Sequence, residues 1–143
     1  MITALDSSVI LDVLTARSSF ADASEALLRR AATEGRLIVG ECVLAEICPA
    51  FKDTAAIEEF LADWEIEFVP SSRPSVLLAG RFFAQHVARG GKSGRILADF
   101  LIGAHAQTHA DRLLARDRGY WRDYFTKLTV LDPSKPSREP SKP

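Results

Sequence analysis

The stretch "TALDSSVILDVL", from Thr3 to Leu14, decides the fold. Its apolar start belongs to a run, Ile2–Leu5, that predicts a short buried strand, and this strand stops at Asp6. Two hydroxyl residues and a second apolar segment follow. An isolated Asp at the end of a strand is often a turn or cap residue, so the position of Asp6 leaves open whether it caps the next segment or has a function.

Four more β-prone apolar runs occur further along the chain, at Leu37–Val39, Glu67–Val69, Leu113–Ala115 and Leu128–Leu131. The segments between them carry apolar residues at helical spacing, as in Phe20–Ala32 and in a predicted helix from about Arg95 to Ala110. Strands that alternate with helices predict an α/β domain with a mostly parallel, five-stranded sheet covered on both faces.

The composition is that of one ordinary globular domain of 143 residues, with 47% hydrophobic and 26% charged residues. A net charge of −1 excludes a global basic field for nucleic acid but not a local basic patch. The two cysteines fit neither a disulfide framework nor a zinc motif. With no signal peptide or membrane-spanning run, we expect a cytoplasmic protein with no membrane partner.

The chain divides into two segments of different composition. Residues 1–132 carry every predicted strand and helix and are expected to form the folded domain. Residues 133–143, "PSKPSREPSKP", are rich in proline, serine and charge and cannot build a core, so a disordered tail is expected.

Acidic residues from four separate segments are expected to meet at the carboxyl edge of the sheet, where open parallel sheets bind ligands. Asp6 closes the first strand and Asp117 follows the fourth strand. Glu46 lies early in the helix that leaves the second strand, and Asp99 lies early in the helix that leads to the fourth. Asp12 and Glu41 are weaker candidates, and they sit near the same edge.

Such a cluster of carboxylates predicts a divalent cation. Neighbouring carboxylates repel one another and take up protons unless a positive charge offsets them. Ligation by oxygen atoms alone suits Mg²⁺ or Mn²⁺ better than zinc. These ions hold phosphate oxygens and lower the pKa of bound water, which is the chemistry of phosphodiester hydrolysis.

The same residues give a resemblance to a known family, carried by "ALDSSVILDVL", "CVLAEI", "LADFLIGAHA" and "LLARDRGYWRDYF" in this order. The chain resembles the PIN-domain ribonucleases, most closely the VapC-like toxins of bacterial type II toxin–antitoxin systems. The resemblance implies a three-layer sandwich around a mostly parallel five-stranded sheet. It also implies metal-dependent endonucleolytic cleavage of RNA.

What the resemblance implies for single residues is specific. Asp6 and Asp99 are expected to ligate the metal directly, while Glu46 and Asp117 bind a second ion, bind through water, or orient the attacking water. Ser8 takes the place of a hydroxyl residue that can hydrogen-bond Asp6, water or phosphate. The implied partners are RNA, a VapB-type antitoxin and a second copy of the chain.

Basic residues near these acids are candidates for contact with an RNA backbone. Lys92 and Arg95 lie in "RGGKSGR" just before the helix of Asp99, and Arg116 and Arg118 flank Asp117. For each of the four, plain surface solvation is an equally good interpretation.

Two other functions fit the sequence less well. A catalytically silent PIN-like domain would bind RNA or protein without hydrolysis. A receiver-like signalling domain also gathers acids at a parallel-sheet edge, but it needs a lysine near the end of a late strand, where this chain has "RLLARD".

Overall fold

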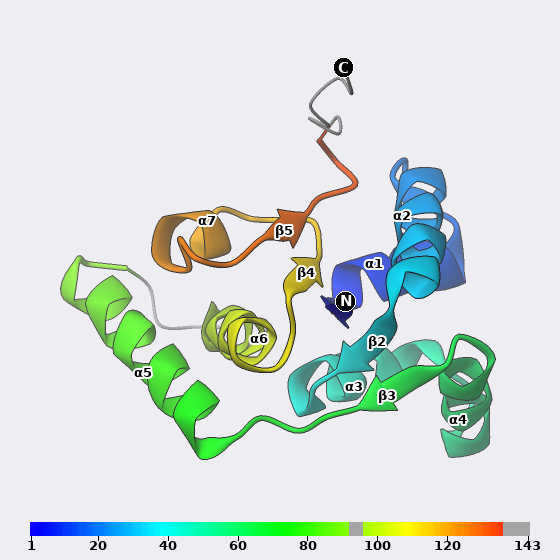
Figure 1. Cartoon of the computed structure of the whole chain (residues 1–143), viewed down its shortest axis with the longest axis horizontal. Helices are drawn as coiled ribbons and strands as arrows, with labels where there is room; N and C mark the ends of the chain where they lie inside the picture. The colour runs from blue at the N-terminus through cyan, green and yellow to red at the C-terminus, as the bar shows by residue number, and fades with distance from the viewer. Residues whose placement is uncertain (92–95, 136–143) are drawn as a thin grey trace.

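Five parallel strands form the centre of the molecule in the computed structural model, which describes residues 1–91 and 96–135 (Figure 1). Their order in the sheet is β3-β2-β1-β4-β5, and every neighbouring pair is parallel. The strands are β1 (Ile2–Leu5), β2 (Arg36–Val39), β3 (Ile66–Phe68), β4 (Arg112–Leu114) and β5 (Val130–Leu131). The predicted strands are therefore present, with ends shifted by one or two residues.

Helices fill the connections between the strands. They are α1 (Ser7–Thr15), α2 (Ala21–Glu34), α3 (Glu41–Ile47), α4 (Thr54–Asp63), α5 (Arg73–Ala88), α6 (Ile96–His109) and α7 (Tyr120–Tyr124). Figure 1 shows α5, α6 and α7 on one side of the strands and α1 and α2 on the other. The predicted α/β architecture, a parallel sheet flanked by helices, is confirmed.

The central strands are buried on both faces, which explains their continuous apolar sequences. Ala4 of β1 pairs with Ile38 of β2 on one side and with Leu113 of β4 on the other, and all three are buried. Because these strands cannot slip without exposing apolar side chains, the register of the sheet is fixed. The residues that follow each strand therefore leave the sheet at fixed points along one edge.

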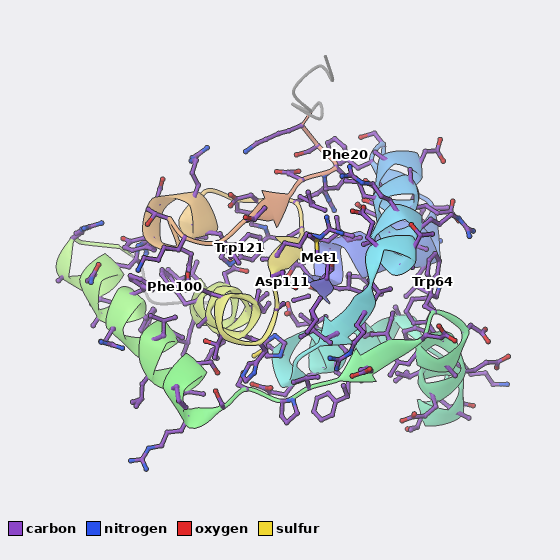
Figure 2. The ribbon with its side chains drawn as sticks, in the orientation of Figure 1. Met1, Phe20, Trp64, Phe100, Asp111 and Trp121 are labelled. Atoms are coloured by element: carbon purple, nitrogen blue, oxygen red, sulfur yellow. The ribbon has the colours of Figure 1, made fainter. Side chains whose placement is uncertain are left out.

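The start of α6 is held against α7 by aromatic packing. Phe100 is fully buried, and Trp121 of α7, which is 3% exposed, donates a hydrogen bond of 2.7 Å from Nε1 to the carbonyl oxygen of Asp99 (Figure 2). Gly103, one turn further along α6, faces the same contact, because a Cβ there would lie 2.6 Å from Cδ1 of Trp121. This close approach places the backbone of Asp99.

Two further expectations concern the C-terminal tail and the absence of a membrane-spanning segment. Residues 133–135 form a turn after β5 in which Asp132 accepts hydrogen bonds from Ser134. Residues 136–143, most of the expected tail, lie outside the described residues. Within the described ranges, no helix is long and apolar enough to cross a membrane.

We predict that Gly103→Ala destabilises the protein by about 1–3 kcal/mol, because the added methyl group overpacks the contact between α6 and α7. Gly80→Ala is the matched control: it lies within helix α5, and a Cβ there would meet nothing within 4 Å. It should stabilise the protein by about 0.5–1 kcal/mol through helix propensity. Urea unfolding measures both, and equal effects of the two substitutions would contradict the packing described for Gly103.

Candidate active site

Asp6 lies where β1 gives way to α1, and it is both a helix cap and a buried acid. Its Oδ2 atom accepts hydrogen bonds from the backbone N–H of Ser8 at 3.2 Å and from the Ser8 hydroxyl at 2.5 Å. Burial raises the pKa of Asp6 above its ordinary value, although these bonds and the positive charge of Arg118 act in the opposite direction. The carboxylate form is thus held at an energetic cost.

Glu46 of α3 and Asp99 of α6 face the same region. Burial raises the pKa of Glu46, and repulsion from Asp6 and Asp99 raises it further. Burial also raises the pKa of Asp99, with added repulsion from Asp6 and Asp117. Hydrogen bonding to the Ser7 side chain acts to lower the pKa of Glu46, a contact that sequence analysis did not anticipate.

Asp117 stands in the loop after β4. Its Oδ1 atom accepts a hydrogen bond of 2.8 Å from the backbone N–H of Gly119, and its own N–H donates to Asp132 at 3.1 Å. Through its effect on Asp99, this loop belongs to the same cluster of negative charge. The structure therefore brings together the four predicted acids, Asp6, Glu46, Asp99 and Asp117, from four separate segments.

One exposed cation faces this cluster. The positive charge of Arg118 acts to lower the pKa of Asp6, Glu46 and Asp99. Its exposed guanidinium is therefore close to the acids and accessible to a ligand in solution.

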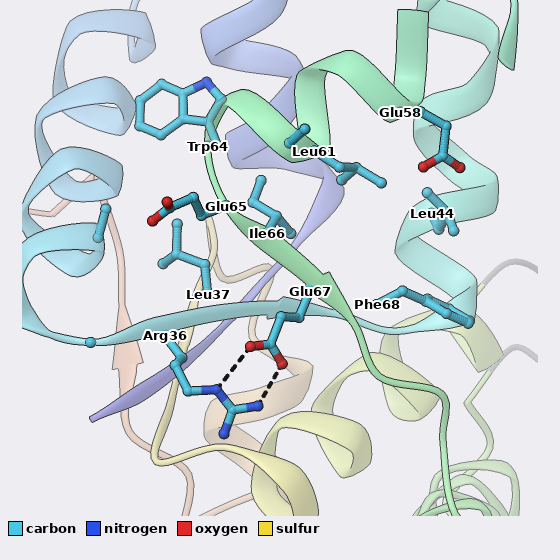
Figure 3. Close-up of a pocket in the computed structure, with 13 residues that line it drawn as sticks. Arg36, Leu37, Leu44, Glu58, Leu61, Trp64, Glu65, Ile66, Glu67 and Phe68 are labelled. Atoms are coloured by element: carbon cyan, nitrogen blue, oxygen red, sulfur yellow. Dashed lines mark hydrogen bonds and ion pairs between the residues drawn. The ribbon is translucent and has the colours of Figure 1, made fainter. Parts of the chain in front are cut away.

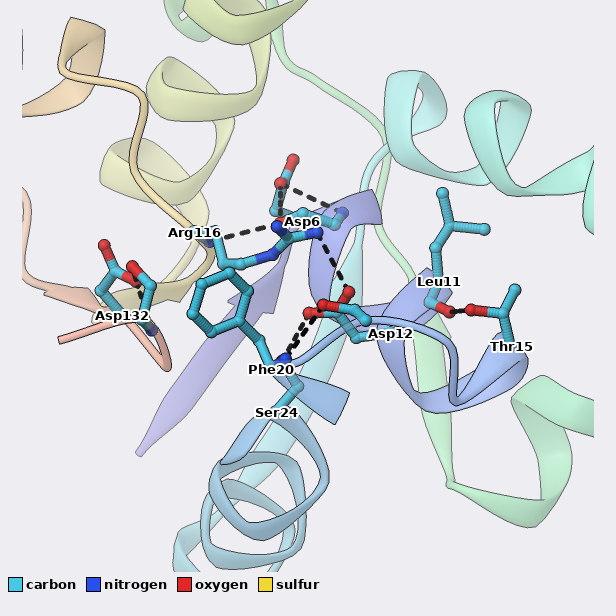
Figure 4. Close-up of polar contacts among 11 residues, drawn as sticks. Asp6, Leu11, Asp12, Thr15, Phe20, Ser24, Arg116 and Asp132 are labelled. Atoms are coloured by element: carbon cyan, nitrogen blue, oxygen red, sulfur yellow. Dashed lines mark hydrogen bonds and ion pairs between the residues drawn. The ribbon is translucent and has the colours of Figure 1, made fainter. Parts of the chain in front are cut away.

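The other basic candidates differ from Arg118. The guanidinium of Arg116 donates a 3.0 Å hydrogen bond to Asp12 and lies over the ring of Phe20, so its partners are within the protein (Figure 4). Lys92 and Arg95 lie outside the described residues.

The two weaker acidic candidates are bound to other parts of the chain. Asp12 is buried, and its two oxygen atoms accept from Arg116 and from the Ser24 hydroxyl (Figure 4). Glu41 accepts the backbone N–H of Ser71 at 2.7 Å. Partial burial acts to raise the pKa of Glu41, but this bonding to Ser71 outweighs it and lowers the pKa. Glu41 therefore does not share the raised pKa found in the cluster.

The two histidines of α6 hold the chain between β3 and α5. His105 is buried with Nε2 at 2.6 Å from the Val69 carbonyl oxygen, and Nε2 of His109 accepts the Ser72 N–H at 3.3 Å. Burial lowers the pKa of His105. Both histidines therefore have partners within the fold.

The donor set of the cluster fits a hard divalent cation, because it consists of carboxylate oxygens, and repulsion among them raises the pKa values of Glu46 and Asp99. Among the described residues, however, no three histidine, cysteine or acidic side chains are grouped closely enough to hold an ion as they stand. The acids are thus close enough to influence one another's charge, but they do not form a preformed cage.

A groove of about 730 Å³ lies away from these acids, along the edge strand β3 (Figure 3). Trp64, Leu61 and Phe68 line it, and an ion pair between Arg36 and Glu67 crosses from β2 to β3. None of the four acids borders this groove. The candidate active site is therefore defined by its charges and not by a deep pocket.

A parallel sheet with acids converging at its carboxyl edge is an arrangement by which α/β domains bind ligands and, with metal ions, act on phosphate groups. The family model described as the PIN domain matches residues 3–124, so the chain belongs to the PIN-domain family. Members of this family are nucleases that generally use divalent metal ions. No protein of curated function matches the chain by sequence.

Solved structures share the fold at low sequence identity. One is VapBC2 from Rickettsia felis bound to a DNA fragment from their promoter, with a TM-score of 0.70, 18% identity, and coverage of 92% of this chain and 98% of that one. VapBC-1 from nontypeable Haemophilus influenzae matches with a TM-score of 0.70 and 20% identity, and the match covers 94% of this chain and 100% of that one. FitAcB from Neisseria gonorrhoeae matches with a TM-score of 0.67 and 19% identity, and the match covers 94% of this chain and 99% of that one.

We predict that Asp99→Asn stabilises the metal-free protein at pH 7. Because the folded-state pKa of Asp99 is raised, its protonation stabilises the fold at low pH, and this contribution is lost as the pH rises through the folded pKa. Asparagine removes the strained charge, so Tm should rise by roughly 2–3 °C, a small effect because the side chain is partly solvated. Thermal unfolding in EDTA between pH 4.5 and 8 tests this, and the gain must shrink toward low pH.

Proposed function

We propose that this protein is the toxin of a type II toxin–antitoxin system, an endoribonuclease that hydrolyses RNA phosphodiester bonds with Mg²⁺ or Mn²⁺. The observation that carries the proposal is the convergence of Asp6, Glu46, Asp99 and Asp117 at one sheet edge, where burial raises the pKa of Asp6, and burial with repulsion from neighbouring acids raises the pKa values of Glu46 and Asp99. Charges of one sign are kept close together against their electrostatic cost chiefly at functional sites. Membership of the PIN-domain family supports the same reaction class.

The roles of the acids are proposed from the family, and the local structure is compatible with them. Asp6 and Asp99 are proposed as direct metal ligands, with the Asp6 side chain held by Ser8 and the Asp99 backbone held by Trp121. Glu46 and Asp117 are proposed to bind a second ion or to orient water, and Ser8 to fix the Asp6 carboxylate through its hydroxyl. When bound, the cation supplies an activated water molecule and neutralises charge on the phosphate.

RNA is proposed as the substrate on the strength of the family, since hydrolysis at phosphorus is alike in RNA and DNA. Arg118 is the described residue best placed to contact a phosphate, because it is exposed beside the acids. Lys92 and Arg95, which precede α6 in the sequence, are proposed as further phosphate contacts. Arg116 is proposed to act from within the protein, given its bond to Asp12.

The proposed partners are a VapB-like antitoxin, which would cover the acids, and a second copy of the chain. The similar VapBC and FitAB structures support the first proposal. Apolar side chains exposed on α5, Val76, Leu77 and Val87, support a protein contact on that helix. A cytoplasmic location goes with an RNA substrate and is part of the proposal.

A silent PIN-like domain remains the second candidate function. It would not need the four acids at one edge, and their retention at an electrostatic cost favours catalysis. A receiver-like role is disfavoured because the cation at the end of β4, Arg116, is paired with Asp12.

We predict that Asp99→Asn lowers RNA cleavage by about 10²–10⁴-fold, because a lost ligand removes several kcal/mol of transition-state stabilisation. Cleavage of total RNA by the purified chain with Mn²⁺ or Mg²⁺ measures this. The same variant should be at least as stable as the wild type, so misfolding cannot explain the loss.

Two controls accompany this measurement. Asp53→Asn changes an exposed helix-capping acid of α4, which accepts the Ala56 N–H and is not one of the four acids, and it should leave the rate unchanged. Excess EDTA should abolish wild-type cleavage, and cleavage that persists unchanged in EDTA would exclude the metal mechanism.

We predict that Arg118→Gln weakens RNA binding mainly by removing one phosphate contact. In the inactive Asp99→Asn background, the slope of log K against log salt should fall by about 1. Arg36→Gln, which breaks the ion pair with Glu67 along the edge strand, is the matched control and should leave the slope unchanged. Equal slopes for the Arg118→Gln variant, the Arg36→Gln variant and the parent protein would show that Arg118 does not contact the RNA backbone.

A further inference from the structure

Arg116 is fixed at three points although it lies in a loop. Its Nη2 atom donates to Asp12 at 3.0 Å, and its guanidinium carbon lies 5.2 Å from the ring centroid of Phe20. Its backbone N–H donates to the Ser8 hydroxyl oxygen at 3.2 Å. The first residues of the loop after β4 are thus joined by side chains to α1 and to the start of α2 (Figure 4).

Asp12 is the anchor of this arrangement. Its side chain is 3% exposed, and its second oxygen accepts the Ser24 hydroxyl of α2 at 2.8 Å. A buried carboxylate with donors on both oxygen atoms has little freedom to rotate, so it can fix the position of the guanidinium.

The arrangement leads directly to the acidic cluster. The Ser8 hydroxyl that accepts from Arg116 donates in turn to Oδ2 of Asp6. A hydroxyl has one proton, so accepting the Arg116 N–H leaves that proton for Asp6. The same loop carries Asp117 and Arg118, and on its other side the Asp117 N–H is held by Asp132, whose side chain is 6% exposed.

We propose that Asp12 is a positioning residue of the active site: through Arg116 it fixes the Ser8–Asp6 hydrogen bond and the loop that bears Asp117. The kinetic part of this inference rests on the proposed nuclease function. The structural part does not. Groups that orient metal-binding carboxylates typically affect affinity or activity by about 10–100-fold when removed.

The experiment compares Asp12→Ala, Asp12→Asn and a matched control, Asp111→Asn. Asn keeps an oxygen for Arg116 and can donate to Ser24, so it should rescue the contacts that Ala removes. Asp111 also accepts a backbone N–H, that of Ile2 at 2.6 Å, but at the opposite edge of the sheet, where β1 and β4 begin.

The first readout is amide hydrogen exchange in the metal-free protein, which needs no activity. In Asp12→Ala the Arg116 N–H should exchange at least about ten-fold faster, because its bond to Ser8 is loosened. The Leu113 N–H, which bonds to Thr129 in the sheet, should keep its wild-type rate and serves as the internal reference. Asp111→Asn should leave the Arg116 N–H unchanged.

The second readout is the split between kcat and KM for RNA cleavage. We expect Asp12→Ala to lower kcat by about 10–100-fold with KM changed by less than about three-fold, and Asp12→Asn to stay within about three-fold of the wild type. A purely structural role of Asp12 would lower the fraction of folded protein and leave kcat per folded molecule unchanged.

A second variant covers the case in which Asp12→Ala does not fold. Arg116→Gln removes the ion pair at a side chain that is 35% exposed, and it should reproduce both effects. If it folds with wild-type exchange at its own N–H and wild-type kcat, the inference is wrong. If the wild type cleaves no RNA, the proposed function fails, while the exchange data still decide whether Asp12 positions the loop.

Discussion

All five strands run in one direction, so the chain leaves every strand at the same edge of the sheet. This constraint brings residues that are distant in sequence into one electrostatic neighbourhood, whatever their charge. Here it gathers Asp6, Glu46, Asp99 and Asp117, each of which raises the pKa of a neighbour or has its own raised. The fold thus concentrates negative charge where open α/β sheets bind ligands.

The same side chains that carry the charge also build the local backbone. Asp6 caps α1 through the Ser8 N–H, and Asp117 closes its loop through the Gly119 N–H. The position of Asp99 depends on Trp121, which binds its carbonyl oxygen from α7. Because capping and packing fix these residues, the site is an integral part of the fold and not an addition to its surface.

Sequence patterns predicted the succession of strands and helices along the chain and the convergence of the four acids. They could do so because burial on both faces leaves apolar runs whose ends can be located. The start of β5 was the least accurate, because this edge strand begins at Val130 rather than at Leu128 and edge strands have weaker patterns. The pairing of Arg116 with Asp12 could not be predicted, because the two lie 104 residues apart and only tertiary structure joins them. The roles of Ser7 and Asp132 were missed for the same reason.

Asp6 and Asp12 lie six residues apart, and their hydrogen-bond partners give the two carboxylates different electrostatic surroundings. Asp12 is bonded on one oxygen by a guanidinium and on the other by Ser24, so its charge is neutralised within the protein. Asp6 accepts from the N–H and hydroxyl of Ser8 but has no ion pair among the described residues, and burial dominates its pKa. Arginine pairing thus separates Asp12, whose charge is offset inside the protein, from Asp6, whose charge is offset mainly by dipoles.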